Sequence, residues 1–168
     1  MSIVIAEYDP KWPDQFWAEE RRVRYALGAL ALRIDHVGST SVPGLAAKPV
    51  IDIQVTVAGA TEADACRVPL SGLGYTYTTI PLPYFHQPSE WPHSHHIHVR
   101  ERGSAEERRM LAVRDWLRAH EGDRCAYEDL KRRLAEGSSA ETPQGRFRYS
   151  EGKTDFIRDL EARTRLDD

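Results

Sequence analysis

The segment from His36 to Val57 decides the fold, and it reads HVGSTSVPGLAAKPVIDIQVTV. Its first residues end a strand, Gly38 and Ser39 form a turn, a short helix follows, and a second strand begins after Pro49. That second strand is rich in Val and Ile but carries one acid, Asp52. A glycine turn at a helix start, followed by a lone carboxylate on the next strand, suits a phosphate and a metal ion.

Side chains along the strand 50–57 alternate strictly between two faces. One face is expected to be polar and to border a site or solvent, and the other is expected to belong to the core. The polar face carries Asp52, Gln54 and Thr56, and the apolar face carries Ile51, Ile53, Val55 and Val57.

The composition indicates a globular protein that forms one domain over residues 1–168, with 40% hydrophobic and 29% charged residues. A formal charge of −3 argues against a general nucleic-acid-binding surface. No apolar run reaches the roughly 20 residues that cross a bilayer, and no signal peptide is recognisable. We therefore expect a cytoplasmic protein without a membrane or nucleic-acid partner, whose thiols, Cys66 and Cys125, are reduced and structural.

The first part of the chain predicts elements that frame this segment. A short strand or extended arm is expected over 2–8, and a helix starts near Pro13 and carries its apolar stripe to Leu30. Residues 30–37 predict the strand that leads into Gly38. A short helix is expected over 61–73 despite its internal proline.

The later part of the chain predicts a strand pair and then helices. The pair comprises 75–80 and 95–102, separated by a rigid, irregular loop that contains four prolines. Ser104 and Glu107 form a capping box that opens a helix through residue 119, and a second helix follows it. A polar, mobile loop is expected over 137–147, and a last helix is capped by Ser150. The order of elements predicts an α+β domain with a small mixed sheet, helices packed on it and a C-terminal helical segment.

Each part of the central segment has a plain and a functional interpretation. The Gly38-Ser39 turn opens a helix whose free N–H groups can hold phosphate, although such turns often bind nothing. Asp52 is costly to bury unless it is paired or bound to a metal, but it also suits an acid that caps a nearby N–H at the sheet end.

The spacing of these features resembles a known signature. Gly38-Ser39, twelve intervening residues and then Asp52 resemble the motif of the DNA polymerase β-like nucleotidyltransferase superfamily. The resemblance implies that the turn holds nucleotide phosphates and that the acid binds Mg²⁺, which stabilises charge on the transferring phosphoryl group.

A closer resemblance is to the GrpB family, a small member of that superfamily, and it covers nearly the whole chain. Its central motif is similar to residues 38–53. The other similar segments are 8–13, 95–99, 111–117, 127–131 and 149–157. The resemblance implies the fold and the pocket more strongly than a reaction, because Gln54 stands where transferases have a second acid. An amide brings no charge to a two-metal site.

Four of the seven histidines lie between His93 and His98. On a strand, His96 and His98 share a face, and both imidazoles face Asp52 if their strand pairs beside it. Two imidazoles and one carboxylate suit Zn²⁺, Mn²⁺ or Fe²⁺ better than Mg²⁺. The alternative is that these histidines hydrogen-bond a substrate or simply stack in the sheet.

Basic and polar residues complete the predicted site. Gly38, Ser39 and Thr40 are expected to hold phosphate, and Gln54 to orient it. A triphosphate would be neutralised by Lys48, Arg114, Lys131 and Lys153. Arg114 and Lys153 fall on inward helix faces, and an acidic partner such as Asp115 would make either one structural. Tyr84 and Trp91 either stack on a base or pack as anchors.

The sequence thus predicts a pocket for a nucleotide or another phosphorylated small molecule with a divalent metal, Mg²⁺ or Mn²⁺, with Zn²⁺ as the alternative. If the protein is an enzyme, Asp52, His96 and His98 are its catalytic and metal-binding residues, and nucleotidyl or phosphoryl transfer is the expected reaction. One alternative is a non-catalytic nucleotide-binding module of this fold. The other is a metal-dependent enzyme of another class that uses the same three residues. A homodimer through the open sheet edge is also expected.

Overall fold

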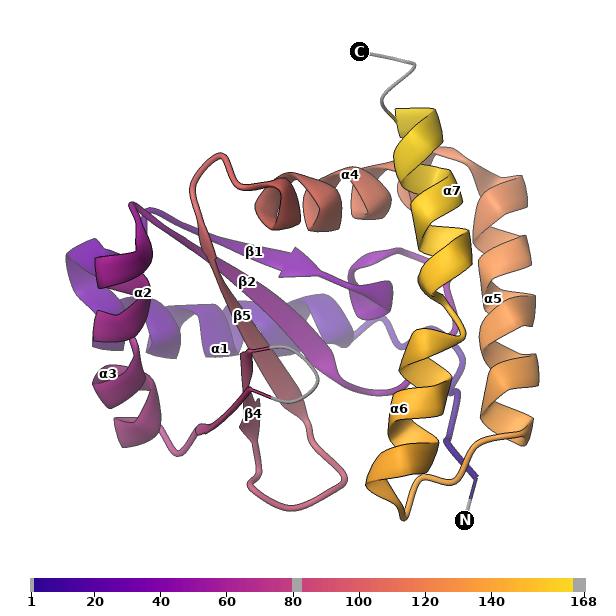
Figure 1. Ribbon diagram of the computed structural model, residues 1–168, viewed down its shortest axis with the longest axis horizontal. Helices are drawn as coiled ribbons and strands as arrows, with labels where there is room; N and C mark the ends of the chain where they lie inside the picture. The colour runs from indigo at the N-terminus through magenta and orange to yellow at the C-terminus, as the bar shows by residue number, and fades with distance from the viewer. Residues whose placement is uncertain (1, 80–82, 165–168) are drawn as a thin grey trace.

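The computed structural model describes residues 2–79 and 83–164, and it places one mixed sheet at the centre of the chain (Figure 1). The strand order is β1-β2-β5-β4-β3. β2 and β5 are parallel, and every other neighbouring pair is antiparallel. The strands are β1 (Arg33–Val37), β2 (Ile51–Val57), β3 (Thr76–Thr78), β4 (Tyr84–Gln87) and β5 (His95–Glu101).

The apolar face of the sheet packs against the first three helices and forms the main core. Ile51, Ile53, Val55 and Val57 of β2 are buried there, as the alternation predicts. In Figure 1, α1 crosses behind the sheet. The elements on this side are α1 (Trp12–Leu27), the one-turn helix η1 (Gly28–Leu30), α2 (Ala60–Ala65) and α3 (Arg67–Gly72).

The C-terminal helices form a second layer with a core of its own. Leu117, Tyr127 and Leu160 from three of these helices meet Val42 and Leu45 of the central segment. Figure 1 shows α4 lying across one end of the sheet and α5, α6 and α7 standing together at its side. The helices are α4 (Ala105–Ala119), α5 (Glu121–Glu136), α6 (Pro143–Glu151) and α7 (Thr154–Thr164). The predicted α+β class, with a mixed sheet and a C-terminal helical segment, is confirmed.

The predicted helix over 61–73 is wrong in its continuity, because the chain forms α2 and α3 with a break at Cys66. Pro69 explains the break. Its nitrogen carries no hydrogen, and its ring clashes with the carbonyl group four residues earlier, at Ala65, where α2 ends.

The predicted pairing of 75–80 with 95–102 is also wrong. β4 lies between β3 and β5 and pairs with both, although its residues fall inside the stretch expected to be a proline-rich loop. The prolines bracket β4 rather than interrupt it, since Pro83 precedes the strand and Pro88 follows it. Ile80 and Pro81 lie outside the described residues.

The expected loop over 137–147 and the expected cap at Ser150 are wrong as well. Helix α6 begins at Pro143, and Thr142 caps it by accepting a hydrogen bond from the backbone N–H of Gly145. Ser150 therefore lies inside α6, and the last helix begins later, at Thr154.

Residues 2–8 form an extended arm with two isolated bridges, at Ser2 and Ala6. None of the described helices combines the length and the apolar character that crossing a membrane requires.

Candidate metal and anion site

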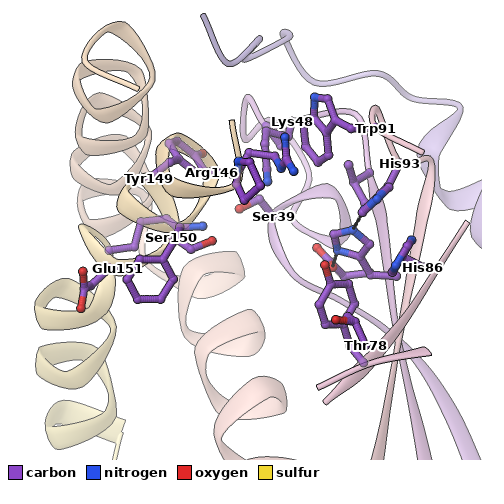
Figure 2. Close-up of a pocket in the computed structure, with 18 of the residues that line it drawn as sticks. Ser39, Lys48, Thr78, His86, Trp91, His93, Arg146, Tyr149, Ser150 and Glu151 are labelled. Carbon is purple, nitrogen blue, oxygen red and sulfur yellow. Dashed lines mark hydrogen bonds and ion pairs between the residues drawn. The ribbon is translucent and has the colours of Figure 1, made fainter. Parts of the chain in front are cut away.

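A pocket of about 910 Å³ opens between the polar face of the sheet and helix α6. One wall consists of residues from β2, β4 and β5 and carries Asp52 and the histidines. The other wall consists of α6 and Lys153, which lies between α6 and α7. Figure 2 shows both walls, with His86 and His93 on the strand side and Tyr149 and Glu151 on the α6 side.

Asp52, His96 and His98 converge at the strand wall. Asp52 is directly opposite His96 in the parallel pairing of β2 with β5, and His98 is two residues further along on the same face. Nδ1 of His96 lies 3.3 Å from Oδ1 of Asp52, and Nε2 of His98 lies 3.4 Å from the same oxygen. One ligand atom from each residue falls within 4.8 Å of the other two. The juxtaposition predicted from alternation is therefore present.

The electrostatics of these groups favour the forms that bind metal. Burial raises the pKa of Asp52, but hydrogen bonding to His96 and His98 outweighs it and lowers the pKa well below its usual range. Burial lowers the pKa of His96. Asp52 is therefore ionised and the His96 imidazole neutral at neutral pH, as metal binding requires.

Gly38 is required at the turn beside this carboxylate. Its φ of 69° is in the left-handed region, where side chains other than glycine are strained. A Cβ at this position would also lie 2.4 Å from Oδ2 of Asp52. The turn therefore packs directly against the carboxylate, so the glycine and Asp52 act as one structural unit.

The hydroxyl groups of the turn are already engaged within the protein. Thr40 is buried, its Oγ1 donates to the carbonyl of Val50 at 3.2 Å, and it lies 3.0 Å from Nε2 of His36. Because Oγ1 has only one hydrogen, His36 is the donor in that second bond. Oγ of Ser41 donates to the carbonyl of Gly38 at 2.6 Å. Ser39 and Thr40 both line the pocket, but the hydroxyl group of Thr40 holds the turn in place.

Cations rather than hydroxyl groups dominate the side of the pocket near α6. Nζ of Lys48 lies 5.3 Å from the ring centre of Trp91 and 5.1 Å from that of Tyr149. Nζ of Lys153 lies 4.5 Å from the Tyr149 ring, and the Arg146 guanidinium lies 5.1 Å from Trp91. The aromatic rings thus hold three cations close together.

These cations lack acidic partners of their own. Across residues 2–79 and 83–164, no carboxylate oxygen lies within 4.0 Å of Nζ of Lys48 or Lys153. Burial and the neighbouring charge of Lys48 lower the pKa of Lys153 to about 7, although Asp52 opposes the shift. The pocket is lined by four basic and two acidic side chains, a formal charge of +2 in a chain whose total is −3. This surplus of half-buried positive charge suits an anionic ligand.

Gly38 does not line this pocket, and three further predicted binding residues also lie outside it. Gln54 is fully buried beneath α4, where its Nε2 donates to the Glu107 carbonyl at 3.4 Å. Arg114 binds the carboxylate of Asp115 at 2.7 Å and the carbonyl of His36 at 3.2 Å, so it has the acidic partner that the structural alternative required.

Lys131, the third of these residues, is buried and donates to the carbonyl of Ala46. Burial and the charge of Lys153 lower the pKa of Lys131 to about 7. Of the predicted basic groups, only Lys48 and Lys153 line the pocket.

The structure adds site residues that sequence reasoning missed. Arg146 and Tyr149 belong to α6, much of which was expected to be a loop, and the T-P-x-G start of that helix was the available signal. His86 belongs to β4, which was also expected to be a loop. Tyr84 packs against His96, with ring centres 4.8 Å apart, and does not stand free to stack on a base.

The donor set fits one divalent cation. Asp52, His96 and His98 offer two imidazole nitrogens and one carboxylate, which suit Zn²⁺, Mn²⁺ or Fe²⁺. In the described part of the chain, no second group of three such residues lies close together. The position that would carry the second acid of a two-metal site is occupied by the amide Gln54. The arrangement therefore supports a single-metal site rather than a two-metal site.

Comparisons with known proteins agree with one another. The model of the family described as GrpB protein matches residues 2–163. The UPF0157 protein BH1888 of Halalkalibacterium halodurans is 38% identical over 161 residues, 95% of this chain and 80% of that protein. The UPF0157 protein SCO7215 of Streptomyces coelicolor is 37% identical over 163 residues, 97% of this chain and 84% of that protein.

A dephospho-CoA kinase and a solved structure are also similar to this chain. The kinase, from Mycolicibacterium paratuberculosis, is 35% identical over 152 residues, 74% of this chain and 37% of the kinase. The crystal structure of the conserved protein GrpB from Enterococcus faecalis superposes with a TM-score of 0.80 at 31% identity and covers 96% of each chain.

Proposed function

The chain belongs to the GrpB family, and we propose that its pocket binds a phosphorylated small molecule, most simply a nucleotide, together with one divalent metal ion. Asp52, His96 and His98 would hold the metal. Lys48, Arg146 and Lys153 would bind the phosphate groups.

One observation supports this proposal above the others: a metal-ligand triad and a group of cations without acidic partners line the same pocket. The triad comes from β2 and β5, and the cations come from the segment before β2, from α6 and from the residue that precedes α7. A metal-bound phosphate needs both parts, because the metal compensates only some of the negative charge. When bound, the metal would polarise a phosphoryl oxygen as a Lewis acid.

The charge and size of the pocket favour a chain of phosphates over a single phosphate group. The lining carries a formal charge of +2, which a divalent ion would raise to +4. A volume of about 910 Å³ lies within the range of small-molecule and cofactor sites. Phe147, which also lines the pocket and is half-exposed, offers a ring for a base. We therefore favour a nucleoside diphosphate or triphosphate.

Two activities fit such a ligand. The first is nucleotidyl or phosphoryl transfer at a single metal, and the similarity to part of a dephospho-CoA kinase supports phosphate chemistry. The second is binding without turnover, which the buried position of Gln54 favours, because a second metal would lack an acidic ligand there.

Thermal unfolding tests the shared part of the proposal. The protein is titrated with ATP, GTP, CTP and UTP, and with the corresponding diphosphates and monophosphates, in the presence of Zn²⁺, Mn²⁺ or Mg²⁺. A ligand at 100 times its dissociation constant stabilises the folded state by about 2.7 kcal/mol, which gives a readily measured increase in Tm. We expect a metal-dependent increase that is larger for triphosphates and diphosphates than for monophosphates.

Two lysine variants serve as a matched pair in this assay. Lys153→Met removes a cation from the pocket wall, and Lys131→Met removes a buried cation that does not line the pocket. Nucleotide affinity should fall at least tenfold in Lys153→Met and stay within about twofold in Lys131→Met. Equal losses in both variants, or no stabilisation by any nucleotide with any metal, would refute the proposal.

A further inference from the structure

His96 has a different partner at each of its two ring nitrogens. Nδ1 lies 3.3 Å from the carboxylate of Asp52, at the candidate metal position. Nε2 lies 3.0 Å from Nδ1 of His93, which belongs to the segment between β4 and β5. The ring therefore connects the metal position to a second histidine behind it.

This geometry constrains where the hydrogen of His96 must lie. A neutral imidazole carries one hydrogen, so one of its nitrogens donates and the other has a free lone pair. Metal binding through Nδ1 needs the lone pair on that atom, which places the hydrogen on Nε2. His93 then has to accept that hydrogen, and its Nδ1 is at the right distance.

The His93 ring is itself held in a fixed orientation. It stacks on His86 with ring centres 4.1 Å apart and planes 16° apart, and Trp91 meets it edge-on at 5.1 Å. His86 is buried, and its Nδ1 lies 3.1 Å from the carbonyl oxygen of Pro88. Because a carbonyl only accepts, His86 donates there. Figure 2 shows His86 and His93 together on the strand wall.

The other imidazole of the triad has no such support. Nε2 of His98 faces Asp52 at 3.4 Å, and among the described residues no hydrogen-bond partner faces its Nδ1. The ring contacts Tyr84, with centres 6.0 Å apart. Within the described part of the chain, His96 is thus the one candidate imidazole ligand whose second ring nitrogen has a protein partner.

We propose that His93 is a positioning residue, which fixes the tautomer and orientation of His96 so that Nδ1 of His96 binds the metal. This inference rests on the proposed metal site. Groups that accept a hydrogen bond from a metal-bound histidine contribute 10- to 100-fold to metal affinity in other proteins. His93 therefore raises metal affinity without touching the metal.

Two substitutions at position 93 separate hydrogen bonding from packing. His93→Phe keeps a ring between His86 and Trp91 but cannot accept a hydrogen bond. His93→Asn loses the stacking but places an acceptor oxygen near the position of Nδ1. We expect Zn²⁺ affinity to fall about 10-fold or more in His93→Phe and to recover in large part in His93→Asn. His95→Phe changes a histidine of the same strand that lies on the opposite face and does not line the pocket, so it serves as the control and should change the affinity little.

Metal affinity is measured by competition with a chromophoric chelator, and the site is observed through the visible absorption bands of bound Co²⁺. Nitrogen-15 spectra of the histidine side chains should place the hydrogen of His96 on Nε2 in the Zn²⁺-loaded protein. Circular dichroism shows that each variant is folded.

The possible outcomes distinguish this inference from the proposed function. If the parent protein binds Zn²⁺ and His93→Phe binds it equally well, the role of His93 is refuted and the metal site stands. Equal weakening in His93→Phe and His93→Asn would show that restoring a hydrogen-bond acceptor does not restore metal affinity, which also refutes the role. If the parent protein binds no Zn²⁺, Mn²⁺ or Co²⁺, the proposed metal site fails and the inference fails with it.

Discussion

The two ends of the polar face of β2 differ in their exposure to solvent. At one end Asp52, whose side chain is 27% exposed, faces the pocket with His96 and His98. At the other end Gln54 and Thr56 are almost completely buried under α4. The same alternation places all three side chains on one face. The difference shows that alternation determines the face, whereas the element packed on that face determines whether it becomes a site or a core.

Removal of the Asp52 charge should have the strongest effect, because Asp52 lies at the end of the polar face of β2 that faces the pocket, which we call the open end. Asp52→Asn keeps the shape of the side chain but removes the charge that a divalent ion needs. Zn²⁺ or Mn²⁺ affinity should fall more than about 100-fold, because substitution of residues that only hydrogen-bond a metal ligand already lowers metal affinity 10- to 100-fold. That loss corresponds to about 2.8 kcal/mol of binding free energy, measured by isothermal titration calorimetry.

The same variant also tests catalysis. Any metal-dependent turnover should disappear in Asp52→Asn, whereas a non-catalytic module would retain most of its nucleotide affinity through the cations. Metal affinity unchanged in this variant would show that the open end of β2 is not a metal site.

Substitutions at the end of β2 that α4 covers, which we call the closed end, should change the stability of the protein and leave metal affinity unchanged. Glu107 is buried in α4 and accepts hydrogen bonds from the Gly103 backbone at 2.6 Å and from Oγ1 of Thr56 at 3.1 Å. Glu107→Gln keeps the volume but leaves weaker acceptors and an amide donor without a partner. We expect the free energy of unfolding to fall by about 2 kcal/mol.

Urea denaturation measures this change, and chelator competition measures metal affinity in the same variant. The affinity should stay within about twofold of the parent, since Glu107 does not line the pocket. A large loss of metal binding without a loss of stability would contradict the division between the two ends.

His36 is a buried histidine outside the pocket. It stacks on Phe16 with ring centres 4.8 Å apart and donates to Thr40. Burial, opposed by Asp52 and reinforced by Arg118 and Arg114, lowers the pKa of His36 to about 4. The unfolded chain therefore takes up its proton first as the pH falls, so stability present above about pH 6.5 is lost towards pH 4.

For His36 alone this loss is about 2 kcal/mol between pH 7 and pH 5. Urea denaturation at the two pH values should show it, and His36→Phe, which keeps the ring stack, should reduce the pH dependence by that amount. His93, whose pKa burial lowers to about 3, contributes in the same direction and remains in the variant. An identical pH dependence in His36→Phe would exclude His36 as the titrating group.

Sequence periodicity predicted only part of the open end of β2. Alternation places His96 and His98 on one face, but their approach to Asp52 was conditional on the pairing of the two strands, which the structure supplies. The same reasoning placed Gln54 in the site, because no local pattern shows that α4 returns to cover it. Arg146 was missed for a related reason: its position depends on α6 facing the sheet across a pocket, which is a long-range contact. Local patterns thus predict which side chains share a face of each strand. Tertiary packing determines which of those side chains reach the pocket.

Gln54 should respond only weakly to substitution, and its response tests whether the two ends of β2 act separately. Gln54 is fully buried, and its Oε1 has no hydrogen-bond partner among the residues that the structure describes. Gln54→Met keeps a similar volume and removes the amide, so the desolvation cost of that oxygen disappears together with one hydrogen bond of 3.4 Å. Stability should rise slightly, by up to about 1 kcal/mol, and metal and nucleotide affinity should not change. If Gln54→Met instead weakened metal binding tenfold, the amide would act on the site from beneath α4, and the two ends of β2 would have to be treated as one site.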